Sequence, residues 1–142
     1  MNVKIKRIDK SLPLPVYQTK GAAGFDILCR KNTEIKPKEV ALIPGNIIVK
    51  VPDGYMLLLA LRSSVPRKKG LLKPHGVGIL DNDYCGEEDE LMIQVYNYTE
   101  KTVTVEKGER IAQGIFVKRG KFEWEESEKM ASPDRGGFGS TG

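Results

Sequence analysis

Hydrophobic and polar side chains alternate with a period of two along several short stretches of the chain. The stretches that alternate in this way, or that are rich in β-branched residues, are 3–8, 40–51, 55–61, 91–96, 102–105 and 111–117. Because successive side chains of a β-strand point to opposite faces, each stretch is predicted to be a strand. Turn residues lie at Pro37, Pro52-Asp53-Gly54, Gly86 and Lys107-Gly108, and Pro44-Gly45 is a further turn signal within the stretch 40–51. This spacing is typical of β-sandwiches and barrels.

No stretch of helical length shows a period of 3.6 residues. Residues 63–69 are predicted to form one helical turn with a serine as its N-cap, and residues 123–130 are a charged stretch that leads to Pro133. We therefore predict an all-β fold of two sheets in residues 1–120. A flexible, glycine-rich C-terminal tail is predicted in residues 121–142.

The composition indicates one domain with a hydrophobic core. The chain has 142 residues and 39% hydrophobic content, which is enough for a core and does not require a membrane span. Residues 1–10 alternate charged and aliphatic side chains and lack the apolar region of a signal peptide, so we expect a cytoplasmic location. Cys29 and Cys85 lie far apart in sequence and are predicted to be reduced thiols.

Metal binding by the protein alone is not favoured. The chain has one histidine, His75, and no close pair of cysteines, so a protein-ligated zinc site has too few ligands. Any metal is therefore expected to be a hard cation that the substrate carries.

The net charge of +4 is segregated along the chain. Residues 62–73 carry five basic side chains and no acid, while residues 81–90 carry six acids and no base. Proteins that bind duplex nucleic acids need one broad basic face, so a nucleic-acid partner is not expected. A basic loop followed by an acidic loop suits a small polyanion and its magnesium, although two solvated turns have the same composition.

The C-terminal residues Arg135-Gly-Gly-Phe-Gly-Ser-Thr-Gly142 combine a cation, an aromatic ring and two hydroxyls on a backbone without bulk. Phe138 can stack on a base, and Arg135, Ser140 and Thr141 can bind a phosphate chain. Composition alone favours a disordered terminus, so the interpretation of this tail depends on the rest of the chain.

Two internal segments have polar groups next to a predicted strand. In Ala22-Ala-Gly-Phe-Asp-Ile27, a glycine and Asp26 stand where a strand begins, which also describes a plain turn-to-strand junction. In Ala60-Leu-Arg-Ser-Ser-Val65, a strand leads into a cation, two hydroxyls and free backbone N–H groups, a combination that suits a phosphate. The serines also suit a helix N-cap.

Two further segments carry candidate chemistry. In Gly78-Ile-Leu-Asp-Asn-Asp-Tyr-Cys-Gly86, a carboxylate can orient or deprotonate a water and Tyr84 can pack against a sugar, but a hairpin turn also favours Asp and Asn. In Lys107-Gly-Glu-Arg-Ile-Ala-Gln-Gly114, Gln113 points into a site or pairs across a sheet.

In chain order, the segments Ala-Gly-Phe-Asp, Arg-Ser-Ser, Gly-Ile-Leu-Asp-Asn-Asp-Tyr, Gly-Glu-Arg-Ile-Ala-Gln and Arg-Gly-Gly-Phe-Gly-Ser-Thr-Gly resemble the five motifs of the trimeric deoxyuridine triphosphatases (dUTPases). The resemblance covers residues 22–142. It implies a jelly-roll-like β barrel and a homotrimer whose active sites are each built from three subunits. It also implies a dUTP diphosphatase that uses Mg²⁺ and hydrolyses dUTP to dUMP and pyrophosphate by attack of water on the α-phosphorus. Such an enzyme limits uracil in DNA and supplies dUMP for dTMP synthesis.

The resemblance implies a role for each matching residue. Asp81 would hold the attacking water as a base, Tyr84 would pack under the deoxyribose, and Asp26 would support the site and the water around the metal. The phosphates and the base would be bound by Arg62, Ser63, Ser64, His75, Gly78 and Gln113. The tail of a neighbouring subunit would supply Arg135, Phe138, Gly139, Ser140 and Thr141, with Phe138 on the uracil. No protein side chain would bind Mg²⁺ directly.

Three features depart from the family pattern. His75 stands six residues before Asp81, where many members have an asparagine near the uracil, so base selectivity is open. Only Gly136 and Gly137 separate Arg135 from Phe138, where many relatives have two more residues. The acidic run 87–90 lengthens the turn after Gly86, and its role is open.

Two alternatives remain at this stage. A dCTP deaminase, or a bifunctional dCTP deaminase and dUTPase, shares the fold and an Arg-Ser-Ser element, but its catalytic glutamate corresponds here to Gln94, an amide that cannot transfer a proton. A non-catalytic nucleotide sensor is disfavoured because Asp81 and Tyr84 are both present.

Overall fold

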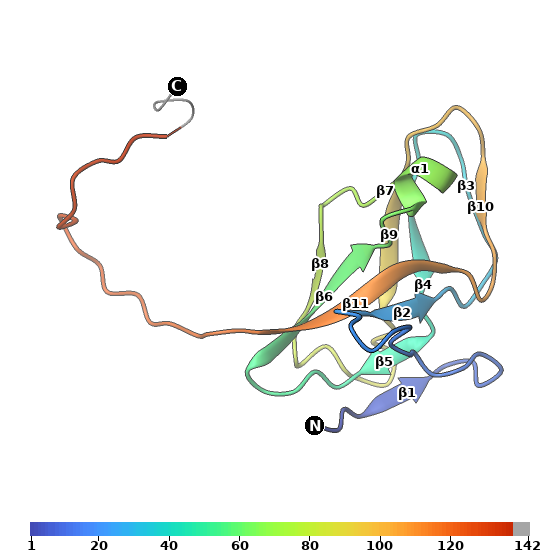
Figure 1. The fold of residues 1–142 in the computed structure, drawn as a ribbon, viewed down its shortest axis with the longest axis horizontal. Coiled ribbons are helices and arrows are strands. Elements are labelled where there is room, and N and C mark those ends of the chain that lie inside the picture. The colour runs from blue at the N-terminus through green and yellow to red at the C-terminus, as the bar shows by residue number, and fades with distance from the viewer. Residues whose placement is uncertain (138–142) are drawn as a thin grey trace.

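Strands make up nearly all the regular structure in residues 1–137, the part of the chain that the computed structural model describes. The strands are β1 (Ile5–Arg7), β2 (Phe25–Leu28), β3 (Thr33–Ile35), β4 (Val40–Pro44), β5 (Ile47–Val49), β6 (Tyr55–Leu61), β7 (Leu71–Leu72), β8 (Gly78–Leu80), β9 (Met92–Asn97), β10 (Val103–Val105) and β11 (Arg110–Lys118). One short helix, α1 (Val65–Lys69), lies between β6 and β7. The predicted all-β fold is confirmed (Figure 1).

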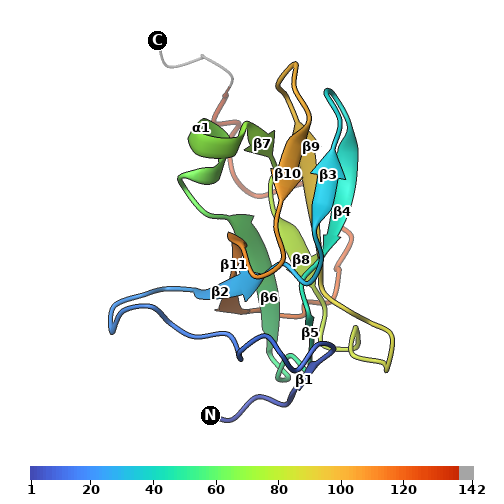
Figure 2. The same cartoon turned by 90° about the vertical axis from the view of Figure 1, so that its right-hand side faces the viewer.

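The strands form antiparallel sheets that enclose one core. The largest sheet has the order β2-β11-β6-β8, a second has the order β4-β9-β7, and β1-β5 and β3-β10 form two-stranded pairs. Figure 2 shows β3, β4, β9 and β10 on one side of the molecule, with β2, β6 and β11 on the other. The fully buried side chains between them include Ile27, Leu57, Leu59, Ile93 and Val95. The resulting architecture is the jelly-roll-like β barrel that the sequence predicted.

Most of the predicted strands are present with small shifts at their ends. The stretch 55–61 matches β6, and 91–96, 102–105 and 111–117 match β9, β10 and β11 within one residue at each end. The stretch 3–8 is longer than β1. These segments were predictable because the alternation of side chains depends only on the residues within each strand.

The stretch 40–51, predicted as one strand, is two strands. The extended backbone is interrupted between β4 and β5 at Asn46, which has a φ of 69° and a buried side chain. The Asn46 Oδ1 accepts a 2.7 Å hydrogen bond from the backbone N–H of Asp9, and the Asn46 backbone N–H donates a 2.8 Å bond to Glu90 Oε1. These contacts with distant parts of the chain compensate a conformation that most residues avoid.

Three short strands were not predicted. β3 and β7 are too short to show a period of their own, and β8 lies in a segment that was interpreted as a glycine-bounded loop. Each becomes a strand because a distant segment of the chain pairs with it, as β6 does with β8 through Leu59 and Gly78. Tertiary pairing therefore decides these elements.

The predicted helical turn is present and a serine occupies its N-cap position, but without a side-chain capping bond. Ser64 occupies the N-cap position of α1 with helical backbone angles, and its side chain makes no capping hydrogen bond. The helix is supported instead by Pro66 in its first turn and ends at Gly70, whose φ is 67°. This single described helix is far too short to cross a membrane.

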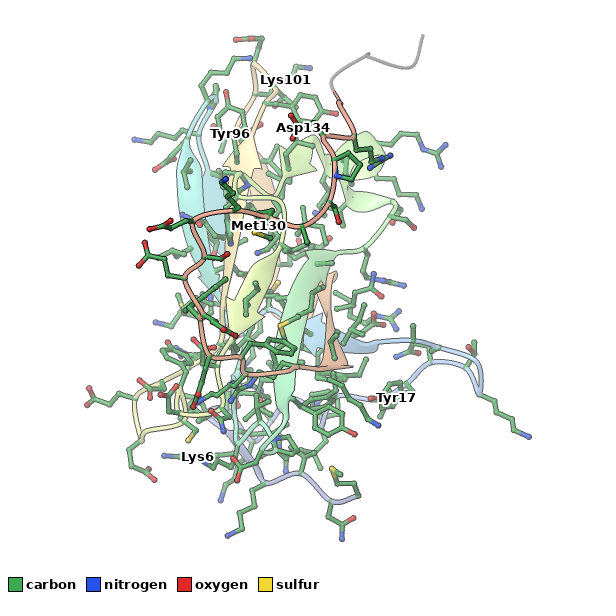
Figure 3. All side chains as sticks on the ribbon, turned by 90° about the vertical axis from the view of Figure 1, so that its left-hand side faces the viewer. Lys6, Tyr17, Tyr96, Lys101, Met130 and Asp134 are labelled. Carbon is green, nitrogen blue, oxygen red and sulfur yellow. The ribbon has the colours of Figure 1, made fainter. Side chains whose placement is uncertain are left out.

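The chain forms no helix or strand from residue 121 to residue 137, and it runs away from the barrel after β11 (Figure 1). Figure 3 labels Met130 and Asp134 on this segment, which we call the arm. Phe122 and Trp124 on the arm are 85% and 99% exposed. The predicted site residues Phe138, Gly139, Ser140 and Thr141 lie outside the described residues.

Candidate active site

Three of the predicted motifs meet at one end of the largest sheet. β11 lies between β2 and β6, and its register sets Gln113 opposite Asp26 on one side and Ala60 on the other. Arg62 directly follows β6, and its backbone N–H donates a 2.9 Å hydrogen bond to the carbonyl oxygen of Ile111. Strand pairing thus brings Asp26, Arg62 and Gln113 into one neighbourhood, which we call the Asp26 cluster.

Asp26 organises two cations in this cluster. Its carboxylate is buried, with Oδ1 3.2 Å from Arg62 Nε and Oδ2 3.2 Å from Arg110 Nη1. A buried carboxylate is costly unless it is paired, so the two arginines are held next to Asp26. Arg110 was not among the predicted site residues, although its place in Gly-Glu-Arg-Ile-Ala-Gln, three residues before Gln113, was a usable signal.

Gly24 allows the segment 22–27 to pack closely against the segment 107–114. A Cβ atom on Gly24 would lie 2.9 Å from the Gly114 carbonyl oxygen and 3.2 Å from Gln113 Oε1. The Gln113 side chain therefore packs over a position that only glycine can occupy without displacement. The glycine of Ala-Gly-Phe-Asp has a packing role and is more than a turn residue.

A cavity of about 300 Å³ opens beside the Asp26 cluster. Its lining includes Arg62, Ser64, Lys68 and Arg110. The one acid that lines it, Glu109, is paired with Lys69 at 2.8 Å between Oε1 and Nζ. Unmatched positive charge with a hydroxyl and a backbone turn suits a polyphosphate. Ser63 is exposed and directly precedes Ser64, which lines this cavity. Lys68 is a second candidate that was not predicted from the sequence.

The segment around Asp81 lies at the other end of β6. β8 runs antiparallel to β6, with Gly78 opposite Leu59 and Leu80 opposite Leu57. Asp81 is exposed, and within residues 1–137 its carboxylate has no hydrogen-bond donor or cationic partner. Tyr84 is 40% exposed, and its hydroxyl donates a 3.1 Å hydrogen bond to the Glu90 carbonyl oxygen. This loop therefore carries the hydrogen-bonded ring of Tyr84 three residues after the unpaired carboxylate of Asp81.

Acidic residues after Gly86 form ion pairs and hydrogen bonds within the fold. Glu87 pairs with Lys6, and the carboxylate of Asp89 accepts a 2.6 Å hydrogen bond from the backbone N–H of Gly86. Glu90 receives two hydrogen bonds from Arg30, of 2.8 and 2.7 Å. These three acids have structural partners, which accounts for a run whose role the sequence left open.

The two groups of predicted residues are not brought together by one chain. From Leu57 to Arg62 the strand advances roughly 17 Å at about 3.3 Å per residue, and Asp81 lies beyond the Leu57 end. His75 is exposed in the turn between β7 and β8, where its carbonyl oxygen accepts a 2.9 Å bond from Val77 N–H. Arg135 is exposed on the arm, and within residues 1–137 it makes no ion pair or side-chain hydrogen bond with either group.

Neither thiol forms a disulfide, as predicted. Burial raises the pKa of the Cys29 thiol to about 12, so Cys29 is neutral and unreactive at ordinary pH. Among residues 1–137, His, Cys, Asp and Glu side chains nowhere gather in threes with the geometry of a metal site.

Comparison with known proteins points to one family. The sequence model of the dUTPase family matches residues 10–142. A deoxyuridine 5'-triphosphate nucleotidohydrolase of Hydrogenobaculum sp. is 37% identical over 145 residues, which cover 100% of this chain and 99% of that protein. The corresponding protein of Helicobacter pylori (strain P12) is 36% identical over 144 residues, which cover 100% of this chain and 97% of that protein.

Solved structures are similar in the same way. The crystal structure of dUTPase from Streptococcus mutans superposes with a TM-score of 0.77 and 34% identity, covering 84% of this chain and 98% of that one. The dUTPase of Staphylococcus bacteriophage 80alpha with dUPNHPP superposes with a TM-score of 0.89 and 28% identity, covering 99% of this chain and 98% of that one.

Proposed function

The chain belongs to the dUTPase family and hydrolyses dUTP, and from this premise we propose which of its residues perform the reaction. The products are dUMP and pyrophosphate, and the bond that breaks joins the α-phosphorus to the oxygen that bridges it to the β-phosphorus. The bond that forms joins the α-phosphorus to the oxygen of a water molecule.

Asp81 is the base that takes a proton from the attacking water. Its carboxylate is exposed and has no partner within residues 1–137, so its lone pairs are available to a water. A carboxylate that accepts the water proton as the new P–O bond forms lowers the barrier of the step.

Tyr84 supports the sugar. Its hydroxyl is tied to the Glu90 carbonyl oxygen, and Glu90 is itself held by Arg30, so the ring has a fixed position. A ring packed against the deoxyribose leaves no room for a 2′-hydroxyl, which excludes ribonucleotides.

The Asp26 cluster binds the triphosphate. Arg62, Ser63, Ser64 and Gln113 contact phosphate oxygens, and Arg110 and Lys68 add positive charge to the same cavity. Asp26 does not touch the substrate; it orients Arg62 and Arg110 through its two carboxylate oxygens. Positioning and charge neutralisation supply most of the catalysis of phosphate hydrolysis.

Mg²⁺ reaches the site on the triphosphate. Both oxygens of Asp26 already face arginines, so this carboxylate does not suit a metal, and no other group of ligands gathers in residues 1–137. A hard cation is well matched to phosphate oxygens and water, and when bound it neutralises the charge of the leaving pyrophosphate.

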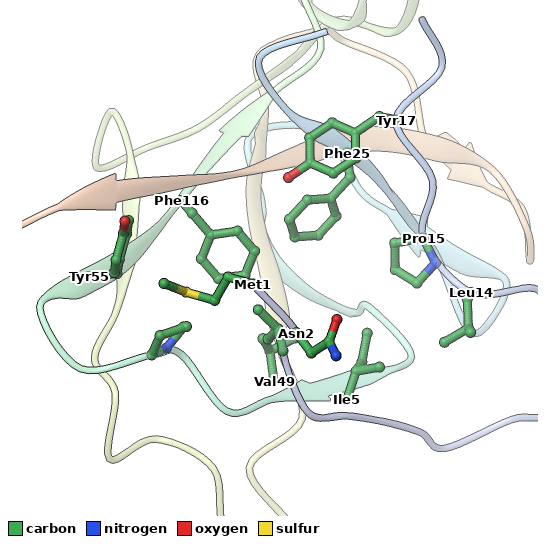
Figure 4. A pocket seen from close by; sticks show the side chains of 12 residues that line it. Met1, Asn2, Ile5, Leu14, Pro15, Tyr17, Phe25, Val49, Tyr55 and Phe116 are labelled. Atoms are coloured by element: carbon green, nitrogen blue, oxygen red, sulfur yellow. The ribbon is translucent and has the colours of Figure 1, made fainter. Parts of the chain in front are cut away.

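The active site is completed by other copies of the chain in a homotrimer. The distance between the Asp26 cluster and Asp81 supports this, because a substrate that contacts both needs them from different subunits. An apolar groove of about 600 Å³ also lies open on the barrel, lined by Tyr17, Phe25, Tyr55 and Phe116 (Figure 4). Exposed apolar surface of this kind is typical of a subunit contact.

The arm of one subunit closes the site of another. It leaves the barrel after β11 and carries Arg135, followed in the sequence by Phe138, Gly139, Ser140 and Thr141. Phe138 stacks on the uracil, Arg135 and the two hydroxyls bind the terminal phosphates, and closure excludes bulk water. Residues 121–142 thus act as a separate functional unit beside the barrel of residues 1–120.

The unpaired state of the Asp81 carboxylate is the observation that carries this mechanism, and Asp81→Asn tests it. We expect kcat for pyrophosphate release from dUTP to fall roughly 10²- to 10⁴-fold while KM changes little, because the amide cannot accept the proton. Asp83→Asn, two residues away on the same loop, is the matched control and should keep most of the activity. Near-normal turnover in Asp81→Asn would remove Asp81 from the role of base. Ammonia release from dCTP by the unmodified enzyme would add deamination to its activities.

A further inference from the structure

Lys73 lies at the open edge between the two larger sheets. It directly follows β7, an edge strand of one sheet, and its side chain reaches β8, an edge strand of the other. Its Cε and Nζ atoms each lie 3.4 Å from the point that a Cβ atom on Gly78 would occupy, and the Leu59 Cβ lies 3.2 Å from the same point. The end of the Lys73 side chain therefore covers Gly78, where the absence of a side chain leaves room for it.

The Lys73 amine has no partner in the described part of the chain. None of the ion pairs and side-chain hydrogen bonds within residues 1–137 involves it, whereas other partly buried cations are paired, such as Arg30 with Glu90 and Lys69 with Glu109. Lys73 is itself only partly exposed, and burial lowers the pKa of its amine below the ordinary value. Within residues 1–137, the Lys73 amine therefore has free donors that a ligand with an acceptor oxygen can use.

The position of the amine relates it to the base of the nucleotide. The resemblance to the dUTPase motifs implies that Gly78 and His75 bind the substrate, with position 75 near the uracil, and Lys73 lies two residues from His75 and against Gly78. The phosphate-binding cations gather around Asp26 instead, near the end of β6 that leads into Arg62. Lys73 thus stands in the part of the chain that carries the sugar and base contacts.

We propose that Lys73 determines base specificity, by donating a hydrogen bond from its amine to the carbonyl oxygen at position 4 of the uracil ring. This inference rests on the proposed function. Uracil has carbonyl oxygens at positions 2 and 4, whereas cytosine has an amino group at position 4, which is a donor. A lysine amine has donors and no acceptor, so it pairs with the uracil oxygen and opposes the cytosine amino group. Sites that hydrogen-bond a polar substrate group reject analogues that leave their own groups unpaired.

Lys73→Met tests the proposal, because methionine keeps an unbranched apolar side chain and removes the donor. The readouts are kcat/KM for dUTP and the inhibition of dUTP hydrolysis by dUMP and by dCMP. We expect a fall of about 10- to 100-fold in kcat/KM for dUTP, mainly through KM, and a loss of the preference for dUMP over dCMP by a similar factor. Lys31→Met, which removes an exposed lysine on the loop after β2, should leave both values unchanged.

Lys73→Gln separates hydrogen bonding from packing and from charge. It keeps a donor without the charge and should retain part of the preference for dUMP that Lys73→Met loses. Equal weakening of dUMP and dCMP in Lys73→Met, with a lowered Tm, would assign the residue to packing and overturn the proposal. An unchanged ratio of the two inhibition constants would also overturn it. An unmodified enzyme that failed to hydrolyse dUTP would instead contradict the proposed function.

Discussion

At the scale of single residues, the buried ionisable groups divide into those with partners and those held neutral. Asp26 is charged and faces two arginines, whereas Cys29 lies in the apolar core with a pKa raised to about 12 by burial. The first arrangement positions cations for a substrate. The second makes the stability of the fold depend on pH.

Cys29 should make the protein less stable in alkali. The thiol of an unfolded chain ionises near pH 8.5, whereas the folded thiol stays protonated up to about pH 12. Between these values only the unfolded state loses the proton. The free energy of unfolding therefore keeps its full value below about pH 8.5 and falls by roughly 1.4 kcal/mol per pH unit above it. Urea unfolding at pH 8, 9 and 10 should show this additional slope in the unmodified protein and not in Cys29→Ala. Equal slopes in the two proteins would mean that the thiol is not buried in solution.

At the scale of elements, β11 is the strand that assembles the Asp26 cluster. It pairs with β2 and β6, and it brings Gln113 next to Asp26 and Arg110 within reach of the same carboxylate. Close packing of β11 on the first motif depends on Gly24, because a side chain there would meet the backbone of Gly114.

Gly24→Ala should damage this junction. Its methyl group would lie 2.9 Å from a backbone oxygen, which cannot move without shifting β11, so we expect a loss of about 1–3 kcal/mol in the free energy of unfolding. The KM for dUTP should rise because Gln113 is displaced. Gly21→Ala is the control, since a Cβ atom there has nothing within 4 Å. Equal denaturation midpoints and equal KM values for the two variants would show that the strands adapt without cost.

At the scale of the whole molecule, the Asp26 cluster and Asp81 lie at opposite ends of β6 within one chain, and apolar side chains are exposed to solvent. The groove of Figure 4 contains Tyr17, Phe25 and Phe116, whose rings approach with centroid distances of 5.8 and 5.7 Å. The arm carries Phe122 and Trp124 with almost no contact to its own barrel. Both features are costly in water for a single chain, and the association of copies proposed above would relieve them.

Trp124 can report this association, because it is the only tryptophan of the chain. It is 99% exposed in a single chain, so its fluorescence should shift to shorter wavelength when the arm docks on another copy. On dilution we expect a red shift together with loss of dUTP hydrolysis and a fall in mass by sedimentation, at the same concentration. Activity that persisted in a population with monomeric mass would refute the shared active site.

Several elements of the fold could be predicted because their signals are local. β6, β9 and β11 show their alternation within their own residues, and the five motifs identify the family in linear order. The interruption between β4 and β5 had a local signal in Pro44-Gly45, directly before Asn46, whereas the short strands β3, β7 and β8 could not be predicted, because each depends on a partner far away in the chain. The partners of Glu87 and Glu90, which are Lys6 and Arg30, could not be predicted for the same reason.

The sequence by itself determined the strand-rich architecture, the family and the list of candidate residues, since hydrophobic alternation and motif order can be read without knowing any contact. Only the tertiary structure decided that Asp26 and Gln113 meet while Asp81 stands at the far end of β6, that Gly24 makes room for Gln113, and that Lys73 covers Gly78 without a partner. The physical reason is that pairing register and burial arise from interactions between distant segments, which the local pattern of the chain does not contain.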